Sequence, residues 1–191
     1  MTGVDDGHSG GMTTIGSPPR ASRRPLLPLA PDVLEELLTG DDAGRPALPF
    51  ADGEGGAPLR CCLRPSRPGE RIALVAYAPL RRWAARTGAD PGAYDEQGPV
   101  FVHASACRGP DPDGPGRHPF AGPGLRRVLR RYDARGHLLG GRLVELPDAP
   151  PPVLDGILDS ALEEAFADPR TVLVHVRAVE YGCFLYEVRG S

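Results

Sequence analysis

The strongest constraint on the fold of this chain is its C-terminal stretch, TVLVHVRAVEYGCFLYEV at residues 171–188. Val172, Val174 and Val176 alternate with other residues, and a period of two is typical of a strand with one buried face. Gly182 indicates a tight connection, because glycine adopts backbone angles that other residues avoid. We therefore predict a closing β-hairpin at this end of the chain.

The rest of the hydrophobic pattern predicts short strands mixed with helices. Residues 125–132 have helical spacing, but the turn that follows favours a hairpin with the strand expected at 137–145. We expect further strands at 71–77 and 98–103, and helices at 31–38, 79–86 and 153–168. Short connections permit antiparallel pairing. The fold class is therefore α+β, a mainly antiparallel sheet of about six strands with two or three helices.

The domain organisation follows from composition along the chain. Residues 1–30 hold Gly, Ser, Thr and Pro with few apolar side chains, so their burial cannot offset the entropy of ordering them. We expect a disordered N-terminal arm there and a single α+β domain over residues 31–191.

Composition also excludes several classes of function. The net charge of −3 argues against a general nucleic-acid binder. No apolar run approaches the ~20 residues that a membrane-spanning helix needs, so we expect a cytoplasmic protein without a membrane partner. The chain contains no lysine, which excludes Schiff-base chemistry and a Walker A loop, and no asparagine, which excludes a Cys-His-Asn arrangement.

The sharpest candidate pair for chemistry is His103 and Cys107, where a predicted strand runs into a loop. Residues four apart share a face whether the segment is helical or extended, so the imidazole and the thiol come close together. A histidine next to a thiol promotes thiolate formation, and the same two groups are soft-metal ligands. The alternative is a core histidine hydrogen-bonded to the backbone beside an inert cysteine.

The hairpin carries the second group of candidates. His175 and Arg177 are two residues apart and point to the same face of their strand, close to Tyr181 and Cys183 beyond the turn. Because guanidinium offers a planar fork of donors, this face predicts a pocket for an anion or carboxylate. The alternative is a solvated outer face.

The four cysteines lie at positions 61, 62, 107 and 183, and in a cytoplasmic chain we expect them to be reduced. Cys61 and Cys62 are adjacent, whereas the usual zinc knuckle has two or more residues between its ligands. Each cysteine alone is also consistent with a small buried apolar residue.

Several short motifs together resemble the DUF1203 family of bacterial proteins, whose function is unknown. They are CLR at 62–64, PGE at 68–70, GPVFVHA at 98–104 with Cys107, RYD at 131–133, and HVR with YGC at 175–177 and 181–183. The resemblance spans roughly residues 58–189 and implies positions rather than an activity. Members of the family commonly carry a Cys-x-x-Cys, but Leu59 occupies its first position here, which argues against Cys62 as part of an obligatory clamp.

Three functions are compatible with these residues. The first is a small-molecule enzyme or ligand-binding protein with a Cys/His/Arg pocket between residues 98–107 and the hairpin, suited to a thiol- or imidazole-dependent enzyme of bacterial specialised metabolism. Its catalytic candidates are His103, Cys107, His175 and Cys183, and Arg177, Tyr181 and Arg131 bind a small, anionic ligand. The second is a Zn or Cu protein that uses Cys107 and Cys183 with His103 or His175. The third is a non-catalytic interaction module. The sequence specifies no cofactor and no oligomeric state.

Overall fold

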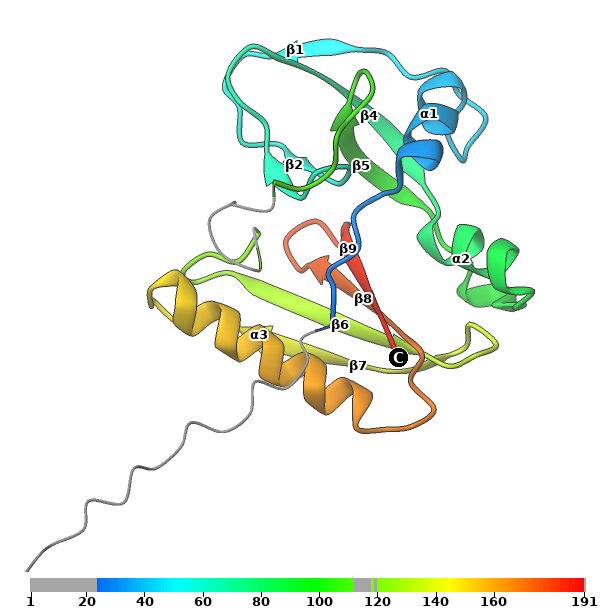
Figure 1. Ribbon diagram of the computed structural model, residues 1–191, viewed down its shortest axis with the longest axis vertical. Helices are drawn as coiled ribbons and strands as arrows, with labels where there is room; N and C mark the ends of the chain where they lie inside the picture. Colours follow the sequence, from blue (N-terminus) through cyan, green and yellow to red (C-terminus); the bar gives the residue numbers. More distant parts are fainter. Residues whose placement is uncertain (1–23, 112–117, 119, 191) are drawn as a thin grey trace, which may run out of the picture.

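The computed structural model describes residues 24–111, 118 and 120–190 of the chain (Figure 1). Three α-helices lie among them, α1 (Pro31–Thr39), α2 (Pro79–Thr87) and α3 (Pro151–Phe166), with one short 3-10 helix, η1 (Gly92–Tyr94). The strands of these residues are β1 (Phe50–Asp52), β2 (Pro58–Leu59), β3 (Arg64–Pro65), β4 (Glu70–Tyr77), β5 (Gly98–His103), β6 (Arg126–Tyr132), β7 (Leu138–Glu145), β8 (Leu173–Ala178) and β9 (Phe184–Arg189).

One sheet has five strands in the order β1-β4-β5-β2-β3. Its longest pairing is antiparallel, between β4 and β5, and places Ile72 opposite His103 at the end of β5. The two-residue strand β2 pairs with β5 in parallel, with Leu59 opposite Phe101. Because β2 and β3 are joined by residues 60–63 alone, this parallel contact brings that short connection beside the end of β5.

The second sheet is antiparallel, with four strands in the order β7-β6-β8-β9. Helix α3 packs against it through Leu154, Leu158 and Leu162, which join Val174 and Val176 of β8 in one hydrophobic core. In Figure 1 the four-stranded sheet and α3 form the lower half of the molecule, and the five-stranded sheet with α1 and α2 forms the upper half.

A second core lies under the five-stranded sheet, where α1 packs on β4 and β5 through Val33, Leu34 and Leu37. Phe184 of β9 belongs to the same core, so the closing hairpin contacts both halves of the molecule. Residues 24–30 run between the halves, as Figure 1 shows. The Leu27 N–H donates to the Glu187 carbonyl at 2.8 Å, and the Leu29 N–H donates to the Arg60 carbonyl at 2.8 Å.

The structure confirms the α+β class and the element types expected from the hydrophobic pattern, including the hairpin at 126–145. The expected strand number of about six is too low, because nine strands lie among the described residues and divide into two sheets. The additional strands β1, β2 and β3 have only three, two and two residues, too short for a periodic pattern. Most of the arm predicted over residues 1–30 lies outside the described residues.

Within the described part of the chain, no helix has the length and apolar character needed to cross a membrane.

Candidate metal centre

Three thiols and one imidazole meet where the end of β5 lies beside the connection between β2 and β3. They belong to Cys61, Cys62, His103 and Cys107, and one ligand atom from each lies within 4.8 Å of all the others. Cys61 and Cys62 come from the connection, His103 ends β5, and Cys107 follows four residues later. This group of four could hold a metal ion.

The two adjacent cysteines reach the same place because the chain forms a single helical turn there. The Leu63 N–H donates to the Leu59 carbonyl at 2.9 Å, the i to i+4 bond of an α-turn. Successive side chains of a strand point to opposite faces, whereas in a helical turn they are about 100° apart. Leu63 has a φ of 54°, the only positive φ of a non-glycine residue in the described part of the chain. Such backbone strain is often found at functional sites.

Backbone hydrogen bonds hold this turn against β5. The Arg60 N–H donates to the Phe101 carbonyl at 3.0 Å, which continues the parallel contact of β2. The His103 N–H then donates to Sγ of Cys61 at 3.3 Å. Hydrogen bonds from backbone amides to sulfur stabilise a thiolate, and they are a common way in which proteins tune metal-bound cysteine.

The imidazole of His103 has a different partner on each nitrogen. Nδ1 lies 3.1 Å from Sγ of Cys61 and 3.9 Å from Sγ of Cys62. Nε2 lies 3.0 Å from Oε1 of Glu70 and also 3.0 Å from Nη2 of Arg64. A proton on Nε2 would be donated to the carboxylate and would leave the lone pair of Nδ1 facing the thiols, whereas a proton on Nδ1 would leave Nε2 to accept from Arg64. A metal bound through Nδ1 requires the first arrangement. A carboxylate on the far nitrogen is the usual support of a metal-binding histidine.

Arg64 fixes the carboxylate that supports the histidine. Its guanidinium makes two parallel hydrogen bonds to Glu70, with Nη1 2.9 Å from Oε2. These bonds hold the pKa of Glu70 far below its usual range, so the carboxylate is charged. Across the cluster, the neighbouring Cys61 thiol, together with His103 and Arg64, lowers the pKa of Cys62. The Cys62 sulfur and burial raise the pKa of Cys61.

Cys107 is the fourth member and lies on a segment without regular secondary structure, residues 104–111. Its sulfur accepts a hydrogen bond from the Gly109 N–H at 3.4 Å. Partial burial raises the pKa of this thiol above the ordinary value. Cys107 is thus the fourth ligand candidate, and it is more exposed than Cys61 and Cys62.

The ligand set matches a common form of zinc site. Structural zinc is bound tetrahedrally by cysteine and histidine, with Cys₃His among the frequent sets. Bonds of about 2.3 Å to sulfur place neighbouring ligand atoms about 3.8 Å apart in such a site. The atoms of this cluster, all within 4.8 Å of one another, are close to that spacing.

Comparison with known proteins covers this whole region. A family model described as a protein of unknown function, DUF1203, matches residues 56–190 and so includes all four cluster residues. The chain belongs to the DUF1203 family. Comparison with curated proteins and with solved structures finds no match.

Sequence reasoning about this DUF1203 chain found half of the cluster. His103 and Cys107 lie together as expected. The spacing of Cys61 and Cys62 argues against the usual zinc knuckle, but the α-turn that ends at Leu63 brings both side chains to the cluster. Leu59 replaces the first cysteine of the family's Cys-x-x-Cys. Cys62 still has a second thiol next to it, because Cys61 belongs to the same cluster.

The sequence analysis does not predict the supporting residues Arg64 and Glu70. Arg64 lies in the CLR motif and Glu70 in the PGE motif, and both motifs belong to the family resemblance. Those motifs are the sequence signal that could have indicated the two residues.

The hairpin candidates lie elsewhere in this DUF1203 fold. His175 is 1% exposed, inside the four-stranded sheet, with its ring centroid 5.0 Å from that of Tyr132 and 5.1 Å from that of Phe184. It is therefore not on a solvated outer face. Its Nε2 is 3.8 Å from Oε2 of Glu187, and burial lowers its pKa, which the glutamate offsets only in part.

The other hairpin candidates have partners of their own. Arg177 donates to the Gly182 carbonyl at 2.9 Å and pairs with Glu96 at 2.5 Å, and the cluster of four does not include Cys183. Tyr181 is 85% exposed.

Arg131 lies 3.4 Å from Asp168. A pocket shared by the hairpin and residues 98–107 stays a prediction.

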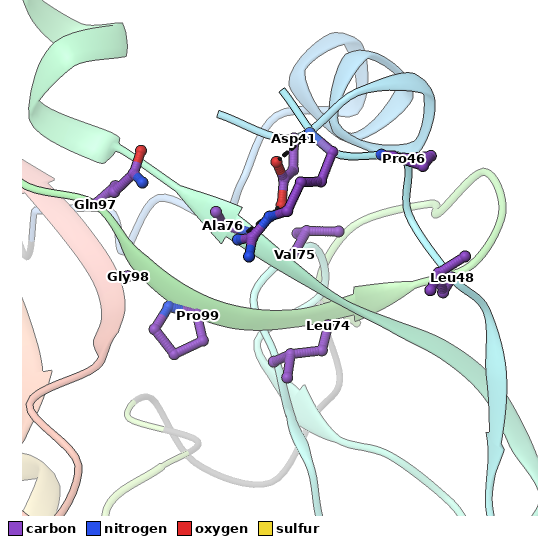
Figure 2. A pocket seen from close by; sticks show the side chains of 10 residues that line it. Asp41, Pro46, Leu48, Leu74, Val75, Ala76, Gln97, Gly98 and Pro99 are labelled. Atoms are coloured by element: carbon purple, nitrogen blue, oxygen red, sulfur yellow. Dashed lines mark hydrogen bonds and ion pairs between the residues drawn. The ribbon is translucent and has the colours of Figure 1, made fainter. Parts of the chain in front are cut away.

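A separate hollow of about 640 Å³ lies on the open face of the five-stranded sheet (Figure 2). Leu74 and Pro99 form its apolar floor, and Asp41 lies at its edge. The Asp41 carboxylate accepts hydrogen bonds from the backbone N–H groups of Ala76, Arg45 and Ala43, which outweigh burial and lower its pKa. Asp41 thus has a structural role, and the hollow contains none of the cluster residues.

Proposed function

We propose that this protein binds one zinc ion through Cys61, Cys62, His103 and Cys107. The observation that carries the proposal is the meeting of four soft ligand atoms within 4.8 Å, from two segments about 40 residues apart in the chain. Cysteines that are buried only for packing would not be expected to gather around a histidine whose second nitrogen contacts a carboxylate.

The donor set selects the class of metal. Ca²⁺ and Mg²⁺ take oxygen ligands, so a site of three sulfurs and one nitrogen disfavours them. Zn²⁺ accepts four such ligands without a redox change, and Cu(I) also prefers thiolates. A set of four protein ligands, three thiols and one imidazole, is a common zinc set and supports zinc ahead of copper. With three thiolates and Zn²⁺ the centre carries a charge of −1, which the nearby Arg64 partly balances.

Metal binding of this kind would contribute directly to folding. The four ligands join the β2–β3 connection, the end of β5 and residues 104–107, the last of which lie on a segment without regular secondary structure. Structural zinc in small domains supplies on the order of 10 kcal/mol of folding free energy. The proposed role is therefore a metal-stabilised scaffold that fixes the irregular segment after β5.

The thiol-dependent enzyme expected from the sequence is the second candidate, and the same cluster supports it. Cys62 is its reactive candidate, because the Cys61 thiol, His103 and Arg64 all lower the pKa of Cys62, as neighbouring donors and cations do at reactive cysteines. In that case the thiols are free in the working protein, and Cys62 is the one expected to react with alkylating reagents at neutral pH.

Metal analysis together with thiol labelling separates the two candidates. Protein purified without added metal and without chelator is expected to contain about one zinc per chain, with Cys61 and Cys62 protected from iodoacetamide. Protein that is free of zinc, copper and iron, and whose cluster thiols label rapidly, would contradict the metal site and support the enzyme.

A further inference from the structure

The four proposed ligands are not held equally. Cys61 and Cys62 are 2% and 5% exposed and lie on a hydrogen-bonded turn. His103 belongs to β5 and is paired with Ile72 across the sheet. Cys107 is only partly buried and belongs to a segment without regular secondary structure. A ligand on such a segment can move away from a metal with little disturbance of the remaining three.

A pocket opens next to this fourth ligand. It has a volume of about 620 Å³ and lies between α1 and the segment after β5. Its lining includes Leu34 and Leu38 of α1 together with Ala106 and Cys107, and Cys107 is the one cluster residue among the described residues that line it. Small-molecule sites have volumes of this order. A small ligand in the pocket would thus meet the cluster at Cys107.

We propose that Cys107 is the exchangeable ligand of the metal centre and that a small exogenous thiol, bound in this pocket, takes its place on the metal. The inference rests on the proposed metal site. In the exchange, the bond between the metal and Sγ of Cys107 breaks and a bond to the incoming sulfur forms. The proton of the incoming thiol passes to Sγ of Cys107, so the exchange needs no oxidant or reductant. Three protein ligands and one exchangeable position are the arrangement of reactive zinc sites.

The charges around the pocket select among thiols. Asp32 and Glu35 of α1 both line it, and each contributes a full negative charge. The pocket follows α1 from Pro31 to Thr39, so it meets both ends of the helix and the helix dipole adds no net preference. The two carboxylates therefore favour a cationic thiol over an anionic one. Exposed charges are screened by solvent, and we expect a preference of roughly tenfold at low salt.

The first test uses the Co²⁺-loaded full chain in a Cys183→Ala background, because thiolate-to-cobalt absorption reports on the sulfur ligands. Cys107→Ala is expected to bind cobalt with weaker thiolate absorption, and 2-mercaptoethanol is expected to restore it. Cysteamine should act at about a tenth of the concentration that mercaptoacetate requires. The matched control is Cys62→Ala, in which added thiol should restore nothing.

The outcomes separate the two proposals. A wild-type chain that takes up neither zinc nor cobalt contradicts the metal site itself. A wild-type chain that binds metal, with a Cys107→Ala variant that does not respond to thiols or responds no better than Cys62→Ala, overturns the exchangeable ligand alone. Equal action of cysteamine and mercaptoacetate overturns the selection by Asp32 and Glu35.

A second measurement needs no substitution within the cluster. In the zinc-loaded Cys183→Ala chain, iodoacetamide is expected to label Cys107 at least tenfold faster than Cys61 or Cys62, as followed by peptide mass spectrometry. Equal labelling rates, or labelling of Cys61 or Cys62 first, would contradict the exchangeable ligand even if Cys107→Ala failed to fold.

Discussion

His103 and His175 both lie on strands beside a glutamate, yet the two regions around them differ in what they can do. His103 ends β5, its Nε2 is 3.0 Å from Glu70, and its other nitrogen faces two thiols. His175 is in the middle of β8, 3.8 Å from Glu187, with its ring between Tyr132 and Phe184. A strand end leaves one nitrogen open to a ligand, whereas a strand interior surrounds the ring with apolar side chains.

The comparison separates a binding role from a packing role. At His103 the carboxylate orients the ring so that a lone pair is presented to a cation. At His175 the carboxylate of Glu187 also pairs with Arg189, and the imidazole ring packs between Tyr132 and Phe184 in the interior of the molecule. Each histidine belongs to an apolar strand. The one at a strand end is placed to bind a ligand, and the one in a strand interior contributes to packing.

The largest expected effect comes from removing the metal. Chelator treatment should lower the unfolding temperature by roughly 20–40 °C, because on the order of 10 kcal/mol of binding free energy is lost from the folded state and each kcal/mol corresponds to about 2–4 °C for a chain of this length. Hydrogen exchange should accelerate at residues 59–63 and 104–108 and remain slow in β8 and β9. Added Zn²⁺ should reverse both changes. An unfolding temperature that chelator leaves unchanged would contradict a structural metal.

Alanine at each histidine should give the second largest effect and the clearest contrast. His103→Ala is expected to lose stoichiometric metal, since one of four ligands is gone. His175→Ala should keep the metal but lower the free energy of unfolding by about 2–4 kcal/mol, through the buried cavity that the ring leaves. Metal content and denaturant unfolding measure the two. Loss of metal from folded His175→Ala would break the distinction.

The sequence was a good guide to the elements and a partial guide to the site. Periodicity located α3, β4 and the closing hairpin because these are long enough to show a period of 3.6 or 2. Strands of two or three residues carry no period, so β2 was missed. With β2 missing, nothing in the sequence could indicate the parallel contact between Leu59 and Phe101, which brings Cys61 and Cys62 to His103.

The fate of the hairpin residues has a similar cause. His175 and Arg177 do share one face of β8, as their spacing implies. Their spacing does not indicate whether this face is exposed. In the structure the other half of the molecule covers it, and Phe184 there joins the core under the five-stranded sheet. Tertiary packing, rather than the local pattern, decided that His175 is buried.

Replacement of the supporting carboxylate should have a smaller effect. Glu70→Gln is expected to weaken zinc affinity by roughly 10- to 100-fold and to leave the stoichiometry at one, because the ligands stay but the imidazole loses its charged partner. Competition with a chromophoric chelator measures the affinity. Glu145→Gln, at an exposed position on β7, is the matched control and should match the wild type. Equal affinities in both variants would remove Glu70 from the centre.

The smallest expected effect is a pH dependence that belongs to His175. Burial lowers its pKa, so below about pH 6.5 the unfolded chain takes up a proton that the folded chain refuses. Stability is therefore complete above that pH and falls as the pH decreases, by at most about 1.4 kcal/mol per pH unit for one group. The unfolding free energy of His175→Gln should lack this component. Identical pH profiles for the two proteins would contradict the lowered pKa.

The most direct test of the central claim is the zinc content of three purified proteins: the wild type, Cys62→Ala and Cys183→Ala. The metal site predicts about one zinc per chain in the wild type and in Cys183→Ala, whose thiol lies outside the cluster, and almost none in Cys62→Ala. Equal zinc in all three proteins, or none in the wild type, would contradict a metal centre built from Cys61, Cys62, His103 and Cys107.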